Sequence, residues 1–378
     1  MKDELQRNAR SGNPMAHIQH RYQPDYVQPP GKVLEEILET RDLSARELAR
    51  RCGRSPKLFV EIIAGKAPIE PATAMQLERV LGMDASIWLN LEAKYRLHLA
   101  QSAEAESFAS VKDFVHRFPI GELVQRGCVK ATQNDTDIAR ELLRFFAAGS
   151  FTAFRERFDE LRTVSFRHSP TFKSDPEPLL AWLRLGELQA ESVETAPFDR
   201  TNFINALAQI RSYTNQDPEE FLSPMISKCA EAGVVFLLIK PFSRLRLSGV
   251  ARWLVPGKGI IQQTLRHKTN DHFWFTFFHE AAHLLLHSRK ALFIDGEKLP
   301  GDDKEEAEAN HWAASFLVPQ HELEKFVSAG SFDLESVTTF SEEIDVAPGI
   351  VVGQLQNRKA VPWNSPLNHL KVTFEWSE

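Results

Sequence analysis

The sequence contains little cysteine. Its three cysteines, Cys52, Cys128 and Cys229, are scattered over 378 residues and odd in number. They argue against a disulfide framework and a cysteine metal site, and they favour a reducing cytoplasm. No apolar run approaches the roughly 18 residues of a membrane span, so we expect no membrane partner. The opening segment MKDELQR has no apolar stretch, so we expect no secretory signal.

Net positive charge is also lacking, because the formal net charge of the chain is −6. This charge argues against a protein that covers nucleic acid with its whole surface, but it is compatible with one basic face. A content of 43% hydrophobic and 25% charged residues is ordinary for a globular protein. A chain of 378 residues predicts two or three domains.

The segment 272–287 is apolar apart from a few side chains and contains His279-Glu280-x-x-His283. Residues four apart share one face of a helix, so both imidazoles can approach one metal ion, with Glu280 beside them to handle a proton. A helix that is apolar on most sides is buried, and buried polar groups need partners. The alternative is a core helix whose histidines are satisfied by hydrogen bonds. The context favours a zinc hydrolase site.

A zinc site of this kind needs a third protein ligand and an open position for water. The helical pattern at 302–318 supplies Glu306, with Asn310 four residues later on the same face. Glu306 can bind the metal while Asn310 hydrogen-bonds a ligating histidine. Pro319 ends this helix.

Residues 31–100 have the pattern of a compact five-helix module. Ser44 caps one short helix that Gly53 ends, and Ser55 caps the next, which begins at Pro56. Two short helices joined by a glycine-containing turn are typical of a helix-turn-helix.

Basic residues outnumber acidic ones by seven to three between 41 and 66, as contact with phosphates requires. The alternative is a dimerisation or peptide-docking module with solvated charges. The residues we expect to contact DNA are Arg46, Arg50, Arg54, Ser55, Lys57 and Lys66. Of these, only Ser55 and Lys57 are candidates to read bases, because the expected recognition helix carries few groups suited to base edges.

Both stretches resemble known families. His279-Glu280-x-x-His283 with Leu-Leu-His287, followed by Glu306-Ala-Glu308-Ala-Asn310, resembles the IrrE/ImmA family of zinc metallopeptidases. This resemblance implies zinc bound by His279, His283 and Glu306, with Glu280 catalytic. His287 then has a packing or supporting role, and Glu308 is the alternative ligand.

Residues 30–100 resemble the HigA-type antitoxins of the phage-repressor-like helix-turn-helix group. The matching blocks are Leu43-Ser44-x-x-Glu47-Leu48-Ala49, Ile62-Ile63-x-Gly65-Lys66 and Trp88-Leu89-Asn90-Leu91. The resemblance implies an operator DNA as partner, and a homodimer is compatible with it.

The expected fold is multidomain and mainly α, with a C-terminal α+β, zincin-like domain that contains a small sheet. Its strands are expected at 233–240, 247–255 and 260–265. By analogy with zincins, the second strand presents an edge to an extended peptide, with Ser248, Gly249 and Arg252 lining the cleft. Gly249 may equally mark a bulge. The expected parts are an arm at 1–29, the helix-turn-helix domain at 30–101, a helical scaffold at 102–225, the peptidase core at 226–331 and a helical tail at 332–378.

The function that these features predict is a cytoplasmic DNA-binding regulator with a zinc endopeptidase that cleaves a regulatory partner protein, either a repressor or a toxin. Arg252 and His311 are candidates for stabilising the oxyanion. The alternative is an antitoxin or repressor whose zinc domain is structural or sensory. The presence of Glu280 favours catalysis, since a purely structural zinc site needs no adjacent carboxylate.

Overall fold

A computed structural model describes residues 27–109, 112–164, 176–243, 245–287, 293–295 and 303–376. Most of the expected arm at 1–29, and the first part of a Pro- and Ser-rich break at 169–178, lie outside these residues. The chain divides into two compact units, Met1–Ala109 and Ser110–Glu378. The mainly α, multidomain class expected from the sequence is confirmed.

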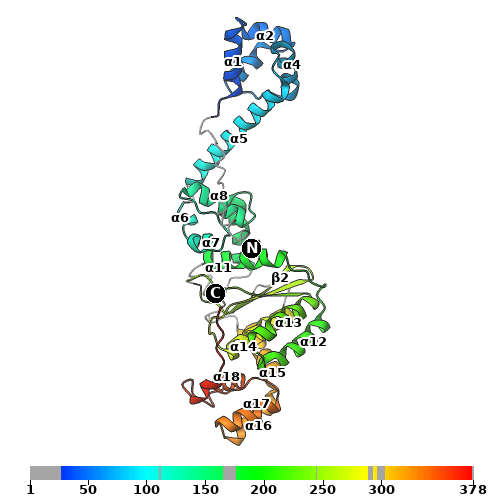
Figure 1. Ribbon diagram of the computed structural model, residues 1–378, viewed down its shortest axis with the longest axis vertical. Helices are drawn as coiled ribbons and strands as arrows, with labels where there is room; N and C mark the ends of the chain where they lie inside the picture. Colours follow the sequence, from blue (N-terminus) through cyan, green and yellow to red (C-terminus); the bar gives the residue numbers. More distant parts are fainter. Residues whose placement is uncertain are drawn as a thin grey trace, which may run out of the picture. The chain divides into compact units, whose positions relative to one another are not determined.

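The described residues of the first unit, 27–109, form five helices, which are labelled in Figure 1. They are α1 (Pro30–Thr40), α2 (Ala45–Cys52), α3 (Pro56–Ile63), α4 (Pro71–Leu81) and α5 (Ala85–Ala109). The Ser44 hydroxyl accepts a hydrogen bond from the Glu47 backbone N–H, and Gly53 ends α2 in the left-handed conformation with φ 64°. Helix α5 extends past the expected boundary at residue 101.

The helices of this unit enclose a core of their own. Leu34, Leu48, Phe59, Leu77 and Trp88 are all fully buried in it. Helix α1 packs closely against the end of α3, because a Cβ at Gly31 would lie 2.1 Å from the carbonyl oxygen of Ile62. Since apolar side chains from α1 to α5 share this core, burial of apolar surface holds α3 in place and leaves its outer face exposed.

The second unit begins with helices. They are α6 (Lys112–Val115), α7 (Ile120–Gln125), α8 (Asp135–Phe145), α9 (Phe151–Val164), α11 (Pro176–Glu191), α12 (Arg200–Arg211) and α13 (Pro218–Glu231), with a 3₁₀ turn, η1 (Ser212–Asn215). Helices α12 and α13 contribute Phe203 and Met225 to the same core as the later segment 273–284. Because α13 runs from Pro218 to Glu231, it crosses the domain boundary that was expected at residue 225.

A four-stranded sheet lies at the centre of this unit, in the order β1-β3-β2-β4. The strands are β1 (Val234–Leu238), β2 (Gly249–Val255), β3 (Lys258–Gln263) and β4 (Phe293–Asp295). Strands β1 and β3 are parallel, whereas β2 is antiparallel to both β3 and β4. The expectation that β2 forms an edge is wrong along Gly249–Ala251, because β4 pairs with these residues.

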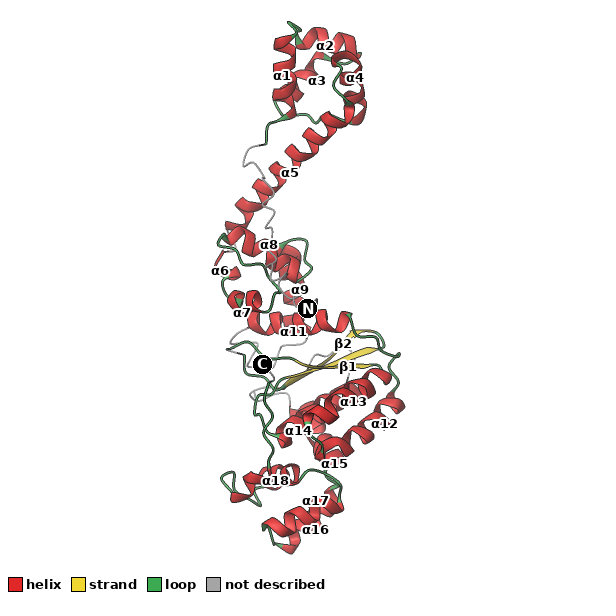
Figure 2. Ribbon diagram, viewed as in Figure 1, coloured by secondary structure: helices red, strands yellow, loops and turns green. Residues whose placement is uncertain are grey.

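Helices cover both faces of the sheet (Figure 2). Val235 and Ile260 face α11, where they cluster with Ala190. The residues that alternate with these, Val234, Phe236 and Ile261, face α13 and α14. This alternation follows from the two-residue period of a strand. As a result, side chains of β2 that are one residue apart reach opposite environments.

Helix α14 (Asn270–Leu286) is the most central element of the unit, and it packs on β2, β3, α15 and α18. The remaining elements are α15 (Asp303–Leu317), α16 (Gln320–Ala329), α17 (Leu334–Glu343), α18 (Pro348–Asn357) and η2 (Pro366–Leu370). The chain end returns to the start of α14, where Lys371 Nζ lies 2.7 Å from Asp271 Oδ2. Within the described part of the chain, no helix is long and apolar enough to cross a membrane.

Candidate metal centre

Two histidines of α14 form the base of the candidate site. His279 and His283 are each only 2% exposed, and their Nε2 atoms lie 2.9 Å apart. One turn of helix separates them, so both rings leave the helix on the same face. The surrounding residues of α14 are apolar and buried, which keeps bulk water away from the two imidazoles.

Helix α15 contributes the third group. One carboxylate oxygen of Glu306 lies 3.3 Å from His279 Nε2, and the other lies 3.4 Å from His283 Nε2. One ligand atom from each of the three residues lies within 4.8 Å of the others, and no second cluster of this kind occurs in the described part of the chain. The three residues selected from the sequence therefore converge on one point.

The protonation states of this cluster suit a divalent metal ion. Burial lowers the pKa of His283 to about 4, so its imidazole is neutral at neutral pH. Burial alone would raise the pKa of Glu306, but hydrogen bonds and charge from His279 and His283 outweigh it and hold this pKa far below its usual value. Imidazole nitrogens and a carboxylate are donors that zinc accepts in sites that leave a fourth position open.

Glu280 lies against strand β2. Its side chain is completely buried, and a Cβ at Gly249 would lie 2.7 Å from Glu280 Oε1 and 3.0 Å from Thr276 Cγ2. Gly249 pairs in regular register with Gln263, and the one irregularity of β2 falls between Trp253 and Val255. Gly249 therefore does not mark a bulge. Its lack of a side chain lets the strand approach the carboxylate.

His287 supports the cluster from behind. Its Nδ1 lies 2.9 Å from Nδ1 of His283, and its Nε2 lies 3.5 Å from Glu308 Oε2. His287 therefore orients the His283 ring through Nδ1, the ring nitrogen that does not face Glu306. Glu308 thus contacts His287 instead of the ligand cluster. Within the described residues, no hydrogen bond joins the Asn310 side chain to either ligating histidine, contrary to expectation.

Arg252 lies on the opposite face of the sheet. Its guanidinium donates hydrogen bonds to Glu187 Oε1 at 2.8 Å and to the Leu183 carbonyl at 2.7 Å, both on α11. Three positions separate Arg252 from Gly249, so strand alternation turns the two residues to different faces. The expectations that Arg252 lines the cleft or stabilises an oxyanion are therefore wrong. His311 is exposed on α15.

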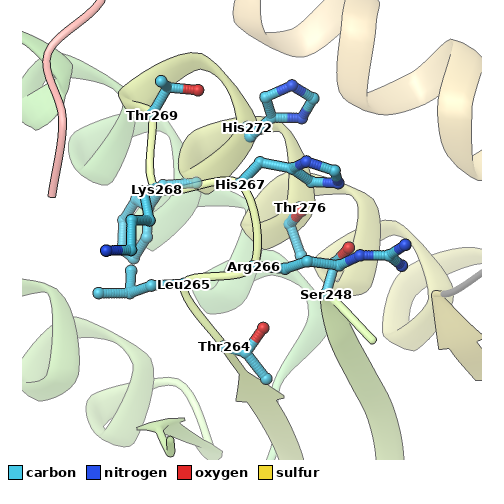
Figure 3. A pocket seen from close by; sticks show the side chains of 10 residues that line it. Ser248, Thr264, Leu265, Arg266, His267, Lys268, Thr269, His272 and Thr276 are labelled. Atoms are coloured by element: carbon cyan, nitrogen blue, oxygen red, sulfur yellow. The ribbon is translucent and has the colours of Figure 1, made fainter. Parts of the chain in front are cut away.

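Sequence reasoning selected Ser248 for a cleft, but it did not select the residues of α14 and of the preceding loop that lie beside Ser248. Ser248 and Thr276 line one recess together with Arg266, His267 and His272 (Figure 3). The signal was present in the spacing, because residues 272, 276 and 280 follow one another at intervals of four. They form a row along the helix beside the row of 279, 283 and 287.

In the first unit, several of the basic residues selected from the sequence already have partners. Glu47 binds both Arg50, at 2.7 Å, and Arg51, at 2.8 Å. Lys57 Nζ lies 3.7 Å from Glu61. The hydrogen bonds from Arg50 and Arg51 lower the pKa of Glu47 to about 2, so this carboxylate stays charged.

The other selected residues of this face are Arg46, Arg54, Ser55 and Lys66, all of which are exposed. Arg54 donates to Gln76 Oε1 at 2.8 Å. Ser55 Oγ accepts from the Leu58 N–H as the cap of α3. The selected basic residues are therefore exposed as expected, but the carboxylate of Glu47 offsets part of their positive charge.

Comparison with known proteins matches the two units to different groups. The family described as IrrE N-terminal-like domain, a peptidase family, matches residues 265–352. In the N-terminal part, the HTH-type transcriptional regulator YddM of Escherichia coli K12 is 34% identical over 82 residues, which are 22% of this chain and 82% of that protein. Virulence-associated protein I of Dichelobacter nodosus is 40% identical over 73 residues, which are 19% of this chain and 68% of that protein.

Two solved structures are also similar. An antidote protein of a plasmid maintenance system from Nostoc punctiforme is 31% identical and has a TM-score of 0.22, covering 22% of this chain and 92% of that one. A HigA-family addiction module antidote protein from Coxiella burnetii is 26% identical and has a TM-score of 0.21, with the same two coverages of 22% and 92%. Through its N-terminal unit the chain belongs to the HTH-type transcriptional regulators, and it carries an IrrE-like peptidase-family domain in its C-terminal unit.

Proposed function

We propose that this chain is a DNA-binding regulator whose second unit is a zinc-dependent endopeptidase that cleaves a regulatory partner protein. The observation that carries the proposal is the convergence of His279, His283 and Glu306 on one point. The two histidines share α14 with a buried Glu280, which is not needed as a metal ligand. A structural zinc site is closed by a fourth protein ligand, whereas a catalytic site keeps three ligands and an open position.

Each side chain then has a definite task. His279, His283 and Glu306 would hold the zinc ion, which polarises a peptide carbonyl and acidifies water. The Glu280 carboxylate accepts a proton from the attacking water and later donates it to the nitrogen of the leaving amine. The buried surroundings of Glu280 exclude competing solvent, and His287 keeps the His283 ring in one orientation.

A partner protein is the proposed substrate because a regulator that cuts itself readily would be hard to keep intact. One chain that carries both a recognition unit and a peptidase raises the effective concentration of a bound partner near the active site. A repressor or toxin that binds the first unit would therefore be cut in preference to proteins in free solution.

The test is a comparison of new protein N-termini in host cells that express wild type or Glu280→Gln. Cleavage products should appear with wild type only, while both proteins retain equal zinc. Glu324→Gln, which changes an exposed carboxylate of α16, is the matched control and should behave as wild type. Identical N-termini in all three samples would reject the peptidase proposal.

For the first unit we propose operator binding through the exposed basic face around α2 and α3, formed by Arg46, Arg50, Arg54, Ser55, Lys57 and Lys66. The similarity to an HTH-type transcriptional regulator supports this function. A second candidate is docking of a protein partner, because Val60 in the middle of α3 is 57% exposed. A gel shift with the protein's own upstream DNA at low salt distinguishes the two, since only phosphate contacts weaken steeply as salt rises.

A further inference from the structure

A recess opens beside the candidate metal centre, and the mechanism described above does not use it. Its volume is about 230 Å³, including the part open to solvent. The loop between β3 and α14 forms one wall, and the first two turns of α14 form another (Figure 3). Most of this volume is open to solvent, so the recess is shallow and has room only for the polar end of one side chain.

The recess ends one helical turn from Glu280, which is not among its lining residues. Ser248 precedes Gly249, and Thr276 contacts the position that a Cβ of Gly249 would occupy, at 3.0 Å. Thr276 is also one helical turn before Glu280, which corresponds to about 6 Å along the axis. An extended peptide advances about 3.3 Å per residue. A substrate that ran along α14 from Glu280 would therefore place a residue about two positions from the cut bond beside Thr276.

The lining has a strong excess of positive charge and no carboxylate. Two of the ten lining residues, Arg266 and Lys268, are permanent cations. In Figure 3 the side chains of Arg266, His267 and His272 extend on the same side as Thr276, whereas Lys268 extends to the other side of the loop. The rings of His267 and His272 stack, with centroids 4.3 Å apart. The nearest acid in sequence, Asp271, is bound to Lys371.

Hydrogen bonds to other segments of the second unit hold the loop 264–269, which carries Arg266 and His267, in place. The Phe374 N–H donates to the carbonyl of Lys268 at 2.6 Å, and Thr269 forms a bridge with Thr373. Thr264 Oγ1 donates to the Leu247 carbonyl at 2.7 Å. A loop held at three points keeps Arg266 in place before a ligand arrives, which reduces the entropy cost of binding.

We propose that this recess binds an acidic side chain of the polypeptide substrate, within about two residues of the cut bond. The inference rests on the proposed peptidase function. Arg266 supplies the charge-assisted hydrogen bonds that favour a carboxylate over its amide, and the hydroxyls of Ser248 and Thr276 offer further donors. The recess thereby makes cleavage depend on an acid at one fixed position.

The test measures binding and not turnover. A displayed library of random peptides is selected on the full-length, zinc-loaded Glu280→Gln protein. We expect one position of the selected peptides to be enriched in Asp and Glu. Replacement of that residue by Asn or Gln should weaken binding about tenfold, as the loss of a charge-assisted contact predicts.

Charge reversal provides the decisive comparison. The variant with Arg266→Glu added should lose the acidic preference and select Lys or Arg at the same position. Lys359→Glu, a surface lysine outside the recess, is the control and should keep the acidic preference. Selection without an acidic position, or an acidic preference that survives Arg266→Glu, overturns the proposal. Absence of Glu280-dependent cleavage in cells rejects the peptidase function separately, because this binding measurement does not require turnover.

Discussion

At the scale of single residues, Gly249 lies where β2 packs tightly against α14. A methyl group at this position would lie 2.7 Å from Glu280 Oε1 and 2.9 Å from its Cγ, closer than nonbonded atoms approach. The strand or the carboxylate must therefore move. The contact explains why a residue without a side chain occupies a buried strand position, where glycine is otherwise unfavourable.

Gly249→Ala should reduce peptidase activity at least tenfold while zinc content stays near wild type, because the displaced group is Glu280 and not a ligand. The free energy of unfolding should fall by about 1–3 kcal/mol, as for other overpacked cores. Gly121→Ala in α7 is the control, since no atom lies within 4 Å of its added methyl. Normal activity of Gly249→Ala would show that the strand tolerates the methyl group and that its approach to Glu280 is not required.

Removal of the two imidazoles should remove the metal. Wild type is expected to contain about one zinc ion per chain, and the double variant His279→Ala/His283→Ala should contain almost none by elemental analysis. His272→Ala, on the same helix but outside the cluster, should retain zinc. A metal-free wild type after incubation with zinc and dialysis would reject the assignment of the site.

Short-range periodicity explains which site residues could be predicted from the sequence. His279 and His283 lie four residues apart on one helix, so their spacing determines their common face, and Glu280 follows directly beside them. Arg252 could not be placed in this way, because its face depends on the register of β2 against β3 and on the position of α11. The contact of Glu308 with His287 likewise depends on how α15 packs on α14, which local sequence does not encode.

At the scale of elements, the exposed face of α2 and α3 combines basic residues with two acids, Glu47 and Glu61. Glu47 holds Arg50 and Arg51 in ion pairs on the surface of α2. These pairs are exposed, so they add little stability. They do affect binding, because a phosphate that approaches either arginine meets the Glu47 carboxylate as well.

Glu47→Gln should therefore strengthen DNA binding at low salt several-fold, since it removes a repulsive charge and releases two arginines. The salt dependence of binding should become steeper at the same time. Fluorescence anisotropy with an upstream DNA fragment measures both effects. Glu39→Gln on α1 changes the net charge equally and serves as the control. If both variants bind alike, net charge and not this face controls affinity.

The secondary structure of the first unit followed from its caps, since Ser44, Gly53 and Ser55 each fix a helix end locally. The sheet was harder to predict. Its three longer strands were visible as apolar or alternating segments, but β4 has only three residues and gives almost no signal. Its pairing with β2 depends on a return of the chain after α14, so the edge of the sheet could not be assigned from local pattern.

At the scale of the whole molecule, the last described segment of the second unit closes over the start of α14. Lys371 and Asp271 form an ion pair at 2.7 Å with side chains only 10% and 7% exposed. The backbone N–H of Val372 also donates to Asn270 Oδ1 at 3.2 Å. Contacts between residues about 100 positions apart in sequence thus fix the N-terminal end of α14.

Lys371→Ala should lower the free energy of unfolding by about 3–5 kcal/mol, because it leaves the Asp271 carboxylate buried without its cation. Denaturant unfolding of the full chain, followed by tryptophan fluorescence, measures the change. Lys359→Ala, an exposed lysine, should have little effect. Adding Asp271→Asn to Lys371→Ala should restore part of the loss. No restoration would show that the lysine acts through packing and not through charge.

The two rows of residues on α14 also restrict how its length can change during evolution. In the proposed function, one row, 272–276–280, would serve the recess and proton transfer, and the other, 279–283–287, would serve the metal and its support. One residue inserted between Thr276 and His279 would rotate the recess residues 272 and 276 by about 100° relative to Glu280 and the two histidines. Substrate recognition and chemistry would then face different directions. Related sequences should therefore differ by substitution within Asn270–Leu286 and place their insertions and deletions outside it.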